Sequence, residues 1–173
     1  MKRRDFEALL VTLESTAALL SRAAAALSPA EARRRPAAGG FSLVENVWHL
    51  ADLEREGYGV RIHRILTESN PALLNFDGDR IARERVYQEK DVDRGIVHFA
   101  RARAQNLEAL AKLSRTEWKR SGAQEGVGCV RLADIPRMMV EHDRAHVAEI
   151  ASLLAEIRGG VPESHLPFQS AVA

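Results

Sequence analysis

The sequence predicts an all-α protein that folds as a four-helix bundle, and two observations support this class. Apolar residues recur at helical spacing in four long segments, which are joined by connections of unequal length. No strand pattern of any length competes with this periodicity. The 173 residues are enough for one domain with a sizeable core. We therefore expect a bundle over residues 1–160 and a loosely ordered tail over residues 161–173.

The first long helix is expected at about residues 5–27. Its apolar residues follow a helical period: Phe6, Leu9, Leu10, Leu13, Ala17 and Leu20. The next four residues, Ser28-Pro29-Ala30-Glu31, form a capping box that predicts a short helical turn. Residues 36–40 are expected to be a loop.

A second capping box, Ser42 with Glu45, predicts that the next long helix begins there and runs to about residue 68. Its buried stripe consists of Leu43, Val47, Leu50, Ala51, Tyr58, Ile62 and Ile65. His49 lies at the border of this stripe and can face inward, whereas His63 lies on the polar side. Two glycines either weaken this helix locally or permit close packing: Gly57 and Gly59.

Turn residues at positions 70–71 and 77–78 bracket a loop. Residues 79–88 then predict a short, highly charged helix. The third long helix begins at Asp91, an acidic cap, and its apolar face consists of Val92, Ile96, Phe99, Leu107, Leu110 and Leu113. His98 lies off this face and is expected at the surface.

Residues 121–128 contain three glycines and are expected to be a loop. They lack the spacing and the lysine of a phosphate-binding loop. Cys129 ends this loop and is interpreted as a small buried residue. The fourth long helix begins between residues 131 and 135, so that Pro136 falls in its first turns, and Gly159-Gly160 ends it.

Composition and charge narrow the classes of protein to consider. The net charge of +1 gives no electrostatic reason to expect a nucleic-acid partner. No stretch is expected to be apolar for long enough to span a membrane, and the N-terminus does not resemble a signal peptide. A single cysteine rules out an internal disulfide, which favours a reducing compartment. The expected location is the cytoplasm.

The fourth helix carries the most informative motif, His142 and His146, in the middle of its apolar stripe. Their spacing of four residues places both imidazoles on one face, and Glu149 follows one turn later. Two imidazoles at this spacing can bind one metal ion, although two hydrogen-bonded core histidines would give the same pattern. Bundles build metal sites from facing helices, so His49 is the predicted third ligand.

Three neutral imidazoles would leave a bound ion at least one open coordination position. The expected cofactor is a divalent ion, and imidazole suits zinc, nickel and iron alike. Glu45 and Asp52 flank His49 by about one turn, and they either orient ligands or are solvated charges. A zinc-protease motif would place glutamate directly after the first histidine, where Asp143 stands, and Asp143 is interpreted as pointing away from the stripe.

Two motifs resemble those of the DinB-like metal-binding superfamily: the segments 42–50 (SLVENVWHL) and 139–150 (MVEHDRAHVAEI). Residues 77–87 and 107–113 also fit the layout of that family, and the resemblance covers about residues 5–158. The resemblance implies a four-helix bundle that binds one divalent metal through His49, His142 and His146. It also implies a homodimer, and some members look like transferases or isomerases that use small thiols.

Two classes of function follow. The first is a metal-dependent enzyme acting on a small molecule, most plausibly a transferase with a small thiol as cosubstrate, because no convincing protein nucleophile is present. A metal-dependent hydrolase is less favoured. The second class is a non-catalytic metal-binding or stress-associated protein. An open pocket at the metal would favour the first class, and a sealed site the second. Trp48 and Leu66, expected to be exposed, support the homodimer.

Overall fold

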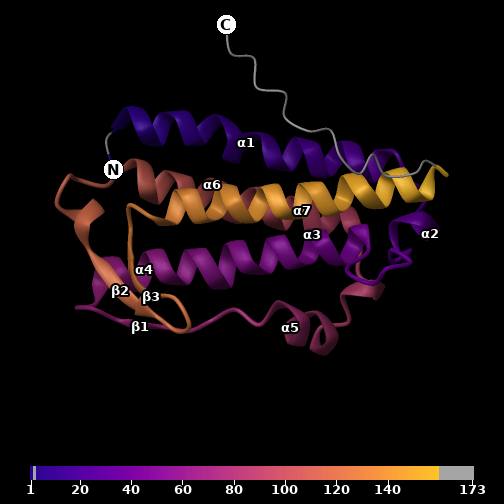
Figure 1. Ribbon diagram of the computed structural model, residues 1–173. Helices are drawn as coiled ribbons and strands as arrows, with labels where there is room; N and C mark the ends of the chain where they lie inside the picture. Colours follow the sequence, from indigo (N-terminus) through magenta and orange to yellow (C-terminus); the bar gives the residue numbers. More distant parts are fainter. Residues whose placement is uncertain (2, 160–173) are drawn as a thin grey trace, which may run out of the picture.

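The computed structural model describes residue 1 and residues 3–159 of the chain (Figure 1). The predicted tail over residues 161–173 lies outside the described residues. The helices are α1 (Arg3–Ala25), α2 (Pro29–Ala32), α3 (Leu43–Asp52), α4 (Val60–Thr67), α5 (Gly78–Glu84), α6 (Val92–Ala111) and α7 (Ile135–Ile157). A π-helical segment (Leu53–Gly59), two 3₁₀ turns (Tyr87–Glu89 and Glu117–Lys119) and the strands β1 (Ala72–Leu73), β2 (Ser121–Gln124) and β3 (Gly128–Arg131) complete the described elements.

Four long helical segments, which we call rods, form the bundle and confirm the predicted fold class. They are α1, the continuous run of α3, the π-helical segment and α4, then α6, and α7. α6 packs against α1 and α3, and α7 packs against the same two helices from the other side (Figure 1). The first two rods along the chain, α1 and α3, are therefore diagonal neighbours. This order places α3 directly beside α7, although 82 residues separate the end of α3 from the start of α7 in the sequence.

Helix caps lie where the sequence predicts them, at the starts of α2, α3 and α6. The side chains of Ser28 and Ser42 accept hydrogen bonds from the backbone N–H groups of Glu31 and Glu45, and both capping boxes are complete. Asp91 caps α6 by accepting a hydrogen bond from the N–H of Arg94. These caps satisfy N–H groups that the first turn of a helix leaves without partners.

The second rod is one continuous helix whose middle, residues 53–59, widens into a π-helix. A Cβ atom at Gly57 would lie 2.4 Å from Leu53 Cδ1, and one at Gly59 would lie 3.1 Å from Asn106 Oδ1 on α6. Gly59 therefore permits close packing against α6, whereas the atom nearest to Gly57 belongs to its own helix. Wide turns of this kind occur frequently at functional sites.

Three short strands form a small sheet, which corrects the expectation of no strands: β1 lies between α4 and α5 in the chain, and β2 and β3 lie between α6 and α7. β2 and β3 form an antiparallel hairpin over residues 121–131, and β1 joins β2 in parallel. The strands have two to four residues, too few to produce a readable alternation. Cys129 is exposed on β3 and Val130 takes the buried position, so the interpretation of Cys129 as a buried residue is wrong.

The core has two apolar clusters, one on each side of a polar layer. On α7 the first cluster includes Met139 and the second includes Ile150, with both histidines of that helix between them. Trp48 and Leu66 are half-buried and pack against these clusters, so they are not the exposed residues that the homodimer expectation assumed.

Among the described residues, one helix is long and apolar enough to cross a membrane by length and composition. It is α1, over residues 4–25, which contradicts the expectation that no stretch reaches this limit. In the structure one side of α1 packs on α6 and α7, and its residues Phe6, Leu13 and Leu20 are buried in the two clusters.

Candidate metal centre

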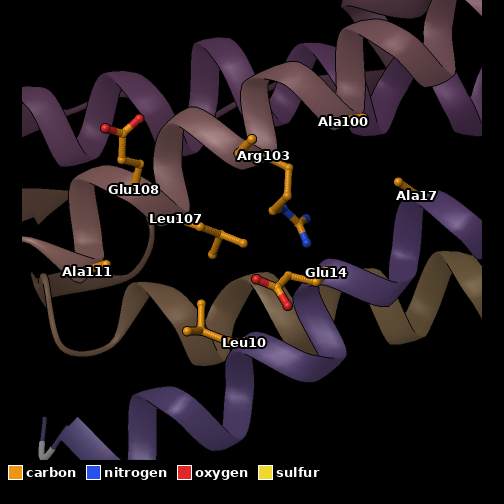
Figure 2. A pocket seen from close by; sticks show the side chains of 9 residues that line it. Leu10, Glu14, Ala17, Ala100, Arg103, Leu107, Glu108 and Ala111 are labelled. Atoms are coloured by element: carbon orange, nitrogen blue, oxygen red, sulfur yellow. The ribbon is translucent and has the colours of Figure 1, made fainter.

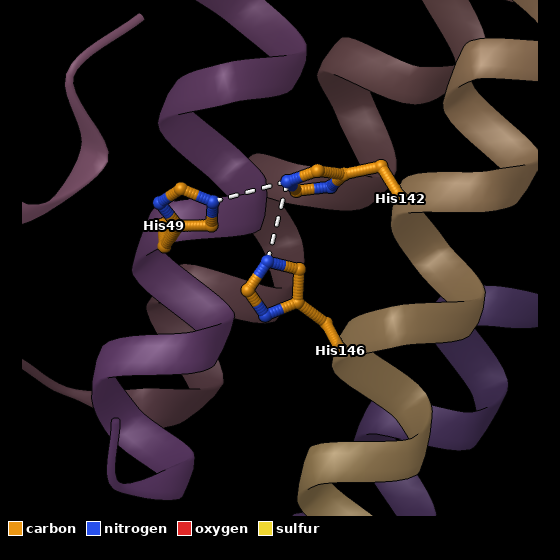
Figure 3. Close-up of side chains that lie close together, drawn as sticks. All are labelled: His49, His142 and His146. Carbon is orange, nitrogen blue, oxygen red and sulfur yellow. Dashed lines mark hydrogen bonds between the residues drawn. The ribbon is translucent and has the colours of Figure 1, made fainter. Parts of the chain in front are cut away.

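The three predicted ligands meet between α3 and α7 (Figure 3). His49 comes from α3, and His142 and His146 come from consecutive turns of α7. The Nε2 atom of His142 lies 3.3 Å from Nε2 of His49 and 3.2 Å from Nε2 of His146. One ligand nitrogen from each of the three rings thus lies within 4.8 Å of the other two. We call these residues the histidine cluster.

The spacing of these nitrogen atoms suits a divalent ion. Two imidazole ligands about 2.0–2.1 Å from a tetrahedral ion lie roughly 3.3–3.4 Å from each other. Hydrogen bonds among the rings explain the contacts less well, because Nε2 of His142 carries either one proton or one lone pair and has two neighbours. The donor set therefore fits a metal ion.

Asn46 fixes the orientation of His146. Nδ1 of His146 lies 2.6 Å from Oδ1 of Asn46. The amide nitrogen of Asn46 donates to the carbonyl oxygens of Phe41 and Ser42, so its oxygen must face the imidazole. Nδ1 then carries the proton, and the lone pair of Nε2 is free for a metal. The sequence analysis missed Asn46, whose only signal is its position one turn before His49.

The ring of His49 is held by packing. Phe41 and Phe76 lie on two sides of it, with ring centroids 5.5 Å and 5.8 Å from that of His49. Gly78, at the start of α5, approaches so closely that a Cβ atom there would lie 2.5 Å from Nδ1 of His49. The Nδ1 atoms of His49 and His142 are buried and have no hydrogen-bond partner.

Burial keeps the cluster neutral. Burial is the main cause and the neighbouring imidazoles add to it; together they lower the pKa of His49 to about 3 and that of His142 to about 4. The pKa of His146 is also lowered by burial, although Glu149 and Asp143 work in the opposite direction. Neutral imidazole is the form that binds metal ions.

A large pocket opens beside the cluster, with a volume of about 1240 Å³. His49 and His146 form part of its wall, and α5 and the loop before α3 form the opposite side. Glu149 also lines the pocket; its side chain is 56% exposed, and Oε2 lies 3.1 Å from Nδ1 of His146. Arg83 lines the pocket without an ion-pair partner among the described residues.

Glu45 and Asp52 contact none of the three histidines, so neither predicted role holds. Glu45 is buried and receives hydrogen bonds from Arg35, Gln88 and the cap Ser42. Asp52 is buried and receives hydrogen bonds from Tyr87 and the arginines Arg55 and Arg85. Both residues bind the segment that precedes α6 to α3 through these hydrogen bonds. Their role is therefore to stabilise the structure around the site.

Asp143, interpreted from the sequence as pointing away from the histidine stripe, has its partners on α1 and α6 and is buried there. Arg103 of α6 donates to both of its carboxylate oxygens, at 2.8 and 2.9 Å, and Thr16 of α1 donates to Oδ2 at 2.7 Å. The sequence analysis considered one buried face of α7, but α7 also packs against α1. Asp143 lies on that second face.

A second carboxylate joins this network. Glu54 of the π-helical segment accepts hydrogen bonds from Arg103 at 3.0 Å and from Asn106 at 2.9 Å. Burial raises the pKa of Glu54 although Arg103 lowers it. Five residues from all four rods thus form the Arg103 cluster: Thr16, Glu54, Arg103, Asn106 and Asp143.

A separate groove of about 420 Å³ lies between α1 and α6 (Figure 2). It is lined mainly by small and apolar residues, and Figure 2 shows the Arg103 side chain reaching from α6 towards α1. None of the three histidines lines it, so this groove is not part of the candidate metal centre.

Comparisons with known proteins agree with this description. Residues 12–150 match the family model of the DinB superfamily. The fold is similar to that of YfiT from Bacillus subtilis, described as a probable metal-dependent hydrolase with an unusual four-helix bundle topology. The TM-score is 0.83 and the identity 20%, and the match covers 93% of this chain and 91% of YfiT. No curated protein matches the chain.

Proposed function

Starting from the fact that this chain belongs to the DinB superfamily, we propose that it is a metal-dependent enzyme acting on a small molecule. His49, His142 and His146 would hold one divalent ion. A divalent ion held there supplies a Lewis acid that lowers the pKa of a bound water or thiol. The chain's own residues hold the ligands in place and shape the pocket.

The observation that carries this proposal is the pocket of about 1240 Å³ at the histidine cluster. A metal ion that only joined α3 to α7 would need no opening of that size. Ligand pockets usually have volumes of about 300–1,000 Å³, so a small molecule fits here with room to spare. The open pocket therefore favours the enzyme over the non-catalytic metal-binding protein.

In this proposal the nucleophile comes from outside the chain. The residues that line the pocket include no cysteine, and Cys129 lies on β3 at the sheet. A small thiol cosubstrate is our first candidate, which would make the protein a transferase.

Hydrolysis is the second candidate, and Glu149 favours it. Its carboxylate lines the pocket beside His146, where it could accept the proton that an attacking water gives up. The description of YfiT as a probable metal-dependent hydrolase supports the same alternative. Glu149→Gln separates the candidates, because it should slow hydrolysis by about 100-fold or more and affect transfer of an already ionised thiol much less.

The test is turnover with the metal removed and restored. Protein without a histidine tag is stripped with a chelator, reloaded with zinc, nickel or iron(II), and assayed with a panel of small thiols against a generic electrophile. We expect metal-dependent loss of the thiol. Metal-dependent turnover without thiol would identify hydrolysis. A protein that binds one ion per chain and turns over no pair would contradict the enzyme and leave the metal-binding protein.

A further inference from the structure

Arg61 is a buried arginine without a counter-charge. It lies on α4 with 6% of its surface exposed, and its Nε atom is fully buried with no acceptor. It makes no hydrogen bond or ion pair with any described residue. Arginine cannot shed its charge at accessible pH, so burial of an unpaired guanidinium is costly. An anion from outside the chain would remove that cost.

Arg61 lies close to the histidine cluster. Its Cζ atom is 5.6 Å from the centre of the Tyr58 ring, and Tyr58 in turn stands edge-on to His142, with 6.5 Å between the ring centres. The charge of Arg61 contributes to the lowered pKa of His142. A second buried donor without a partner, Nδ1 of His142, lies on the ring that Tyr58 contacts.

The charges of this region are unbalanced once an ion is bound. Three neutral imidazoles leave a divalent ion its full charge, and Arg61 adds another positive charge on the far side of Tyr58. Burial lowers the pKa of Arg61, and only Tyr58 works against that effect. No carboxylate is among the causes of this shift in the pKa of Arg61, although Asp143 works to raise the pKa of His142. A ligand that carries a negative charge is therefore favoured in this part of the site.

We propose that Arg61 binds the carboxylate of the small molecule that binds at the metal, so that the substrate or cosubstrate is a small carboxylic acid. The inference rests on the proposed function. A guanidinium matches a carboxylate through two parallel N–H donors. A single buried guanidinium balances one negative charge, which favours a carboxylate over a doubly charged phosphate. Nδ1–H of His142 is available as a further donor, as metal-bound histidines usually require.

The test compares two probes that differ only in charge, mercaptopropanoate and mercaptopropanamide, on cobalt(II)-loaded protein. Both thiols report binding at the ion through the thiolate-to-cobalt absorption band. We expect the wild-type protein to bind the acid about tenfold or more tightly than the amide, as for a hydrogen bond between charged groups. Arg61→Met should bring this ratio close to one without changing the affinity for the amide. Arg61→Lys should keep part of it.

Arg83→Met is the matched control, because Arg83 lines the pocket and has no ion-pair partner among the described residues. It should keep most of the preference for the acid. An equal ratio in the wild type and in Arg61→Met, with the band present, would overturn the inference. Failure to take up cobalt(II) would instead overturn the proposed function, so the two failures are distinguishable.

Acetate provides a test on the wild-type protein alone, which guards against a variant that does not fold. Acetate should reduce the advantage of the acid while the band of the amide persists. If acetate displaces both probes equally, the carboxylate binds at the ion and the inference is wrong. If metal-free protein binds acetate through Arg61 as tightly as metal-loaded protein does, Arg61 binds a free anion. The inference that it binds the carboxylate of the metal-bound molecule is then wrong.

Discussion

Two buried arginines of this bundle have opposite surroundings. Arg103 donates to Asp143, Glu54 and the carbonyl oxygen of Leu13, and two carboxylates surround its charge. Arg61 is buried to a similar degree and has only the Tyr58 ring beside it. The same contrast holds for the regions around them: most donors of the Arg103 cluster have acceptors, whereas two Nδ1 atoms of the histidine cluster have none.

This contrast distinguishes buried polar groups that stabilise the fold from buried polar groups that are available to bind a ligand. A buried network satisfied within the chain joins helices and needs nothing further. Buried lone pairs that converge on one another and buried donors without acceptors destabilise a folded protein. They are retained where a bound ligand satisfies them or where function requires them. We therefore assign the Arg103 cluster to stability, and the histidine cluster with Arg61 to binding.

The largest effect should distinguish the two arginines directly. In metal-free protein, Arg103→Met leaves Asp143 and Glu54 buried without their cation, and the free energy of unfolding should fall by about 3–5 kcal/mol. Arg61→Met removes an unpaired charge and should lower it by less than about 1 kcal/mol, or raise it. Urea denaturation followed by circular dichroism measures both. Equal losses would show that Arg61 also stabilises the fold.

Removal of a ligand should abolish metal binding and leave the fold intact. His142→Ala should weaken the binding of zinc by more than about 100-fold, because even groups that only orient ligands contribute 10–100-fold. His98→Ala is the control, since His98 is exposed and stacks on Trp48. Elemental analysis after dialysis gives the metal content. One zinc per chain in His142→Ala would remove His142 from the ligand set.

A smaller effect is expected from the residue that orients His146. Asn46→Ala removes the acceptor of its Nδ1 proton, and zinc affinity should fall about 10–100-fold. Glu149→Ala should matter less, because its carboxylate is largely exposed and lies farther from the same atom, at 3.1 Å against 2.6 Å. Competition with a chromogenic chelator measures both affinities. A larger loss for Glu149→Ala would make Glu149 the main orienting group.

The smallest effect concerns pH. In metal-free protein the pKa values of His49 and His142 are lowered to about 3 and 4, so both imidazoles are already neutral at pH 6. Zinc affinity should therefore change by less than about tenfold between pH 8 and pH 6, with loss only as the pH approaches 4.

The same pKa values predict a change in stability. Unfolded histidine takes up protons below about pH 6.5 and these folded imidazoles do not, so the metal-free protein should lose stability as the pH falls from there towards 4. Urea titrations at several pH values measure this. A steep loss of zinc centred near pH 6.5 would mean that the histidines are not buried as described.

Features that depend on neighbours along the chain could be predicted. The capping boxes at Ser28 and Ser42 and the apolar periods of the four rods are local, because they are set by groups within one or two turns. The spacing of His142 and His146 is local in the same sense. The strands escaped prediction because their pairing, not their short sequence pattern, defines them.

The helices, the bundle class and the pairing of the two histidines of α7 thus follow from the amino-acid sequence alone. It also supplied His49, since a helix beginning at Ser42 turns that residue towards the inside. The tertiary structure decided that α3 lies beside α7, that Asn46 orients His146, and that Arg103 is paired while Arg61 is not. Hydrogen bonds and ion pairs between helices depend on the order of the helices in the bundle and on the rotation of each helix about its axis. An apolar period alone is compatible with several orders and rotations, so it does not specify these contacts.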